Sequence, residues 1–187
     1  MVLNRTRYWI ITIFYTLFIF ASLPITPTVW KYLQVSFGYL PLYSIYLIYL
    51  SSTITMLGYL FFISQKRNIT TYLNFVAIAT IFGYYLKTIS IPAEKIHLIE
   101  YALLSYFMGK SFQLGDAGNR DIRYFQVFLL ITFIGVLDEG LQYYLPNRVF
   151  DIKDIWLNSL AGFLGLACLR LIIYSRPGES SKPAEER

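Results

Sequence analysis

The residues of this sequence that could do chemistry fall in two short blocks. The first block, PAEKIHLIEY, holds the only histidine, His97, three positions after Glu94 and three before Glu100. The second, LDEGLQYYLPNRVFDIKDIWLN, begins with the adjacent carboxylates Asp138 and Glu139. A histidine beside carboxylates is a usual setting for general acid or base work, and carboxylates in an apolar stretch need a proton, a cation or a strong donor. We therefore expect His97, Asp138 and Glu139 as candidate catalytic residues.

Further polar residues in the same blocks could bind a substrate. Lys95 and Arg148 could hold an anionic group such as a phosphate. Structural roles are also open, because Asp151 and Asp154 could cap the helix that follows, and Asn158 could form a hydrogen bond between helices. The expected substrate-binding residues are Lys95, Gln142, Arg148, Asp151, Asp154 and Asn158.

The sequence identifies neither a metal nor a cofactor. It lacks the H-E-x-x-H, Walker A, G-x-S-x-G and C-x-x-C signatures. Glu94 and His97 alone are a weak metal signal, and the single cysteine, Cys168, has the setting of a small packing residue. Any metal at the two polar blocks therefore stays an open possibility.

The elements that must position these residues are membrane-spanning helices. The chain is 56% hydrophobic and only 14% charged, against ~25% charged in an ordinary soluble domain. Apolar runs of ~20 residues are long enough to cross a bilayer. We expect an all-α, polytopic membrane helix bundle of about six transmembrane helices, with spans at approximately 8–23, 38–63, 70–90, 97–113, 123–145 and 155–174.

The distribution of basic residues predicts the orientation of these spans. If the N-terminus is inside, eleven of the 16 lysines and arginines lie in inner segments. Positive residues favour the cytoplasmic side, so both termini are predicted to be cytoplasmic and the two polar blocks to face outward. The net charge of +5 does not indicate nucleic acid as a partner, because the basic residues are scattered between apolar runs.

The two blocks also resemble a known family, the VanZ-like membrane proteins. The resemblance rests on EKIHLIEYALLSYFMG and on the order D-E-x-x-Q, P-x-R and D-x-x-D-x-x-x-N in the second block. It implies a VanZ-like three-helix core at 91–176, with Gly162 and Gly165 in a packing segment. The remainder is expected to be N-terminal helices without a motif at 1–90 and a disordered cytoplasmic tail at 177–187. The family is associated with low-level resistance to the glycopeptide teicoplanin, and the resemblance implies no particular reaction.

Two classes of function compete on these residues. The first is a protein of the cell membrane that binds or modifies an anionic lipid or a lipid-linked cell-envelope intermediate. The second is a non-catalytic membrane subunit or scaffold, whose polar residues form a structural network or dock another membrane protein. A transporter is a third hypothesis, and the lack of evident inverted repeats counts slightly against it. Whether the protein is an enzyme is left open by the sequence.

Overall fold

The structure, a computed structural model, describes residues 2–63, 68–113, 120–146, 148 and 150–174. Helices account for nearly all of these residues. The expected tail at 177–187 lies outside the described residues. The helices are α1 (Val2–Ser22), α2 (Thr26–Phe37), α3 (Leu40–Gly58) with its π-helical extension η1 (Tyr59–Ile63), α4 (Ile69–Thr88), α5 (Pro92–Gln113), α6 (Arg120–Tyr143) and α7 (Ile152–Tyr174).

Local sequence explains where several helices begin and end. Prolines occupy the first turn of α2 and of α3, where the missing amide hydrogen costs nothing. The side chain of Asn68 caps α4 by accepting a hydrogen bond from the amide of Thr70 at 3.0 Å. Gly38 ends α2 with a φ of 60°, a conformation that side chains with a Cβ adopt rarely.

The expected all-α membrane bundle is confirmed, and each of the six expected spans coincides with a helix, the second of them with α3 and η1 together. Four helices are long and apolar enough to cross a membrane, namely α3 with η1, α4, α6 and α7. Helices α1 and α2 form a fifth candidate, bent by 69° at the break between them. Helix α5 is less apolar because it carries the whole of the first polar block.

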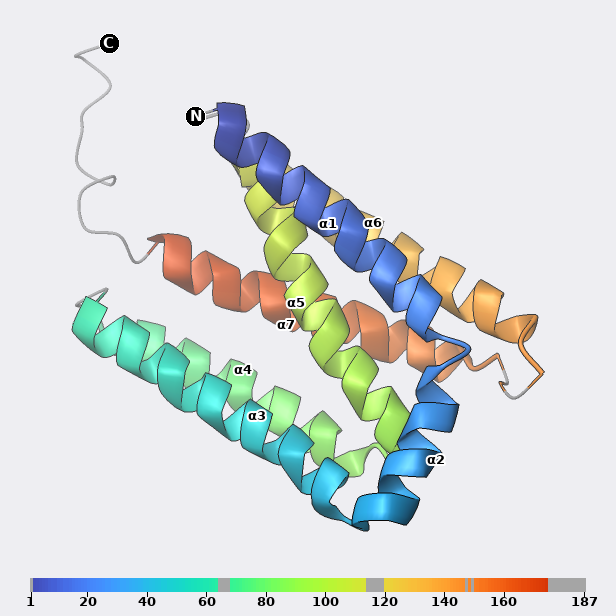
Figure 1. Ribbon diagram of the computed structural model, residues 1–187. Helices are drawn as coiled ribbons and strands as arrows, with labels where there is room; N and C mark the ends of the chain where they lie inside the picture. Colours follow the sequence, from blue (N-terminus) through green and yellow to red (C-terminus); the bar gives the residue numbers. More distant parts are fainter. Residues whose placement is uncertain (1, 64–67, 114–119, 147, 149, 175–187) are drawn as a thin grey trace, which may run out of the picture.

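Helix α5 lies at the centre of the molecule. It packs against α1, α6 and α7, and more lightly against α2 and α3 (Figure 1). Helices α3 and α4 run side by side as a hairpin on the other side of α5 and α7. Large apolar side chains such as Phe14, Leu47 and Phe133 are exposed on the outside of the bundle. Such a surface is expected of a bundle surrounded by lipid.

Glycines set the close contacts of α7 with its neighbours. A Cβ at Gly165 would lie 2.5 Å from the carbonyl oxygen of Ala102 on α5, and one at Gly162 would meet the side chain of Ile131 on α6. Small residues allow such close approach of helices in membranes. Gly162 and Gly165 therefore lie at close contacts between helices, as expected for a packing segment.

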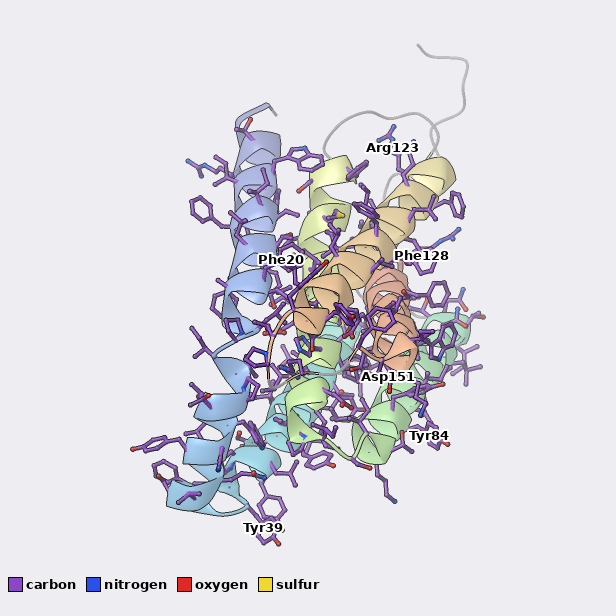
Figure 2. The ribbon with its side chains drawn as sticks, turned by 90° about the vertical axis from the view of Figure 1, so that its right-hand side faces the viewer. Phe20, Tyr39, Tyr84, Arg123, Phe128 and Asp151 are labelled. Carbon is purple, nitrogen blue, oxygen red and sulfur yellow. The ribbon has the colours of Figure 1, made fainter. Side chains whose placement is uncertain are left out.

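The bundle has two distinct ends. Helix α1 begins and α7 finishes at one end, whereas α5 begins and α6 finishes at the other (Figure 1). Figure 2 shows this separation along α6, with Arg123 near its start and Asp151 beyond its last turn, towards the end that also holds Tyr39 and Tyr84. The two polar blocks thus meet at a single end of the bundle.

Candidate functional site

A buried polar cluster forms where the first turns of α5, the last turns of α6 and the start of α7 come together. Its members are buried or half-buried although most of them are ionisable. Buried ionisable groups in a membrane protein are costly and are normally paired or functional. We define the polar cluster as Glu94, His97, Glu100, Tyr101, Asp138, Glu139, Gln142, Arg148 and Asp154.

Helix α5 contributes a histidine–carboxylate pair. His97 is only 6% exposed, and its Nδ1 lies 3.0 Å from Oε2 of Glu100, one turn further along the helix. The atoms are at ion-pair distance without the geometry of a hydrogen bond, and Nε2 of His97 is buried without any partner among the described residues. One imidazole nitrogen is therefore held by a carboxylate while the other is left for a ligand or water.

Helix α6 contributes two carboxylates with different surroundings. Oε1 of Glu139 accepts a hydrogen bond from Nε2 of Gln142 at 3.0 Å, and its Oε2 accepts one from the amide of Asp151 at 3.2 Å. Glu139 thereby fixes the connection between α6 and α7. Asp138 is fully buried, with Oδ2 3.5 Å from Nε2 of Gln142 and Oδ1 unpartnered in the described chain. Of these two carboxylates, Asp138 is the one with an oxygen that accepts no hydrogen bond from the described residues.

The connection between α6 and α7 places Arg148 beside these groups. Its charge acts on His97, Asp138 and Asp154, but no carboxylate of the described residues lies at ion-pair distance from it. Its Nε and Nη2 atoms are buried and have no hydrogen-bond partner there. These two donors point along the same edge of the guanidinium, the edge that binds two oxygens of a carboxylate or phosphate. The Nε and Nη2 donors of Arg148, called the guanidinium fork below, are therefore placed to bind an anion.

The start of α7 separates the roles of two aspartates. Asp151 is exposed, and its Oδ1 accepts the amide of Lys153 at 2.8 Å, as a helix cap does. Asp154 is half-buried and lies in the first turn, within the electrostatic influence of Arg148 and His97. Of the two, Asp151 has the capping role and Asp154 belongs to the polar cluster.

Asn158 lies one turn deeper in α7. It is 3% exposed, and its side chain would be the closest neighbour of a Cβ at Gly135, at 3.3 Å. Asn158 thus packs into the contact between α6 and α7, below the cluster.

Lys95 points to a different part of the molecule. It is 4% exposed, and its Nζ donates to the carbonyl oxygens of Leu86 and Ile89, the latter at 2.6 Å, and to the hydroxyl of Tyr46 at 3.3 Å. An ammonium group has three donors, so these contacts use all of them. Lys95 therefore has no free donor left for the substrate-binding role expected of it. Its ammonium group instead caps the carbonyl oxygens at the end of α4.

Three members of the cluster, Glu94, Glu100 and Tyr101, were not among the expected site residues. Glu100 pairs with His97, and the fully buried Tyr101 faces Asp138 without closing a hydrogen bond. Their signal in the sequence is spacing, since residues three and four after His97 share its face of a helix.

The outer rim of the cluster is acidic. Glu94, in the first turn of α5, is half-buried, and burial raises the pKa of its carboxyl. The nearby carboxylates of Asp154 and Asp151 raise this pKa further, and the positive charges of Arg148 and His97 act against them. Within the part of the chain that the structure describes, no three of the His, Cys, Asp and Glu side chains are grouped so that they could hold a metal ion.

These features define an α-helical membrane protein with a buried polar site at one end of its bundle. The family model described as VanZ/LLP1 matches residues 8–173, and the chain therefore belongs to this family. The match includes α1 from residue 8 onward and all of α2 to α4, so most of the N-terminal part in which the sequence shows no motif also lies within the matched region. Neither the curated proteins nor the solved structures include a match to this chain.

Proposed function

We propose that this VanZ-family protein binds the phosphate-bearing headgroup of an anionic lipid or a lipid-linked cell-envelope intermediate in the polar cluster. The observation that carries the proposal is the Arg148 side chain, whose Nε and Nη2 are buried without a partner among the described residues. Leaving charged donors unsatisfied is costly, and two oxygens of a phosphate would satisfy both at once.

The neighbours of Arg148 support a site that could also exchange a proton. His97 is held by Glu100 through Nδ1, which leaves Nε2 buried without a hydrogen-bond partner among the described residues. A histidine oriented in this way can give or take a proton near neutral pH. In this proposal His97 acts with Glu100 as its orienting group, Asp138 offers a second acceptor, and Glu139 with Gln142 holds the connection that carries Arg148.

The proposed orientation places the cluster at the outer face of the cell membrane, with both termini in the cytoplasm. It rests on the excess of lysine and arginine in the segments assigned to the inside. A cluster at that face would meet lipids and envelope intermediates of the outer leaflet, which fits the association of VanZ-like proteins with teicoplanin resistance.

Headgroup binding can be tested by comparing two changes of a positive residue at the same end of the molecule. Arg148→Lys keeps a charge and removes the fork, so the affinity for phosphatidylglycerol or a polyprenyl phosphate should fall about tenfold, the effect of one lost charged hydrogen bond. Lys153→Gln removes an exposed charge outside the cluster and should change little. Native mass spectrometry of the purified protein measures both, with diacylglycerol as the lipid without phosphate.

The outcomes separate specific binding from general attraction. Equal losses in Arg148→Lys and Lys153→Gln would mean that surface charge alone attracts the lipid. Unchanged affinity in Arg148→Lys would overturn the proposed role of the fork.

A non-catalytic structural role is the second candidate, and a specific observation favours it. Both carboxylate oxygens of Glu139 accept hydrogen bonds, one from Gln142 and one from the amide of Asp151. The second of these bonds links α6 to the start of α7. A cluster whose other members served the same purpose would hold the helices in register or prepare a surface for another membrane subunit.

A further inference from the structure

A second, apolar site lies on the opposite side of α5 from the polar cluster. It is a cavity of about 320 Å³ between the α3–α4 hairpin and the pair formed by α5 and α7. On α5 it is lined by Ile99 and Tyr106, which follow His97 by two and nine positions and so point away from it around the helix. None of the residues that line the cavity is charged.

Three of the hydroxyl groups in its wall, those of Tyr49, Ser52 and Thr53, are already satisfied by carbonyl oxygens. The hydroxyl of Tyr49 donates to the carbonyl oxygen of Ala79 at 2.7 Å, across the hairpin. The hydroxyls of Ser52 and Thr53 both donate to the carbonyl of Tyr49 within their own helix. A ligand would therefore find little to bind by hydrogen bonds, and its contacts must be apolar.

The hairpin that forms one wall is loosely attached to the rest of the bundle. Only 11% of the residues in the apolar stretches of α3 and of α4 are buried, against 39% in α7. Direct contacts between the hairpin and the rest of the bundle are made by α4 with α7, by α3 with α2 and, more lightly, by α3 with α5. The residues that line the cavity lie in the middle of α3, α4 and α5 and in the second half of α7. Since α3, α4 and α7 are apolar enough to span a membrane, the cavity falls at the depth of lipid hydrocarbon.

We propose that this cavity binds one acyl chain of a membrane phospholipid, which packs the α3–α4 hairpin against α5 and α7. An acyl chain matches the site because it is apolar, flexible and present at that depth on every side of the protein. The volume is at the lower end of that of small-molecule sites, as expected for a single chain. The headgroup remains outside, at the membrane surface, since the cavity has no charged lining. This site is independent of the proposed headgroup site.

The experiment uses the full-length protein in vesicles of phosphatidylethanolamine and phosphatidylglycerol. A trace of phosphatidylcholine carries a photoreactive diazirine at the middle of one acyl chain, and the crosslinked residues are mapped by peptide mass spectrometry. Labelling should concentrate on the cavity residues Leu103 and Cys168 over the lipid-facing residues Leu129 and Phe133 of α6.

A matched pair of variants on α4 tests whether the cavity itself is responsible. Ala79→Phe fills the cavity and should reduce labelling of Leu103 and Cys168 several-fold, whereas Ala77→Phe adds the same ring on the exposed side of α4 and should not. Met56→Trp fills the cavity from the α3 wall and should repeat the effect. Arg148→Lys should leave this labelling unchanged, which separates a failure here from a failure of the headgroup proposal.

Three results would overturn the inference. The first is labelling of Leu103 and Cys168 no stronger than that of Leu129 and Phe133 in the unmodified protein, which decides the matter even if a filling variant does not accumulate. The second is labelling that neither filling variant reduces. The third is labelling of the cavity by a photoreactive polyprenyl phosphate and not by the acyl probe, which would assign it to an isoprenoid chain.

Discussion

Two cations at the same end of the bundle, the buried Lys95 and the half-buried Arg148, differ in how their donors are used. All three donors of Lys95 go to oxygens of α3 and of the end of α4, whereas two donors of Arg148 have no partner in the described chain. A buried charge that is satisfied internally holds structure, and one that is not satisfied attracts a ligand or water. Arg148 is therefore the residue whose substitution reports on binding, and Lys95 the one that reports on stability.

Substitutions at His97 and Asp138 distinguish a ligand site from a structural network. If the proposed site is correct, His97→Ala and Asp138→Asn abolish function while the protein still inserts and accumulates, because their unpartnered atoms serve the ligand. The measurement is teicoplanin susceptibility of an expressing host, which is the readout that the family resemblance implies, beside an immunoblot of its membranes. Loss of the protein from the membranes would instead favour the structural role.

Most cluster members could be predicted from residue type and spacing, but the direction of each side chain could not. His97, Asp138, Gln142 and Arg148 stand out because polar residues in apolar runs need a reason. Lys95 has the same signal, yet it is two positions from His97 and so points to another face of α5, where the end of α4 receives it. The position of the end of α4 beside α5 results from tertiary packing, which the spacing of residues within one helix does not reveal.

At the scale of elements, the contact between α5 and α7 determines whether the cluster assembles. The two helices carry His97 and Asp154, and their backbones approach closely deeper in the bundle, at Gly165. A side chain at this position would push the helices apart and spread the cluster above it.

A single added methyl group should reveal this dependence. In Gly165→Ala the new Cβ would lie 2.5 Å from the carbonyl oxygen and 3.0 Å from the Cα of Ala102, so backbone must move, at a cost of about 1 to 3 kcal/mol. We expect a lower melting temperature in detergent. Gly58→Ala meets nothing within 4 Å and should leave the melting temperature unchanged or slightly higher. Equal behaviour of the two variants would contradict the close contact.

Helix α2 is an element that the sequence did not predict. It has 12 residues, too few to cross a bilayer, and it falls between the first two expected spans. Pro27 in its first turn and Gly38 after its last are start and stop signals, but Pro24 also fits a plain loop. What holds α2 as a helix is its packing on α3 and α5, with Trp30 in the core, and such contacts are not visible in a short segment.

At the scale of the whole molecule, the difference between the two ends gives a test of orientation. Alkaline phosphatase is active only outside the cytoplasm, whereas green fluorescent protein exported through the general secretory route does not fluoresce. A phosphatase fused after Tyr144, at the cluster end, should be active, and a fluorescent protein fused after Tyr174 should fluoresce. Because positive residues favour the inside, the opposite pattern is not expected, and finding it would place the cluster in the cytoplasm.

The central position of α5 has a consequence for biogenesis. This helix carries Glu94, Lys95, Glu100 and Lys110, and a charged residue at the centre of a bilayer costs about 2.5 to 3.5 kcal/mol on insertion scales. Its partners for these charges come from helices made before it, since Lys95 needs the end of α4, and from helices made after it, since His97 and Glu100 adjoin α6 and the Arg148 connection. We therefore expect α5 to enter the membrane next to α1 to α4, and the nascent chain to remain beside its insertion machinery until α6 and α7 have been made.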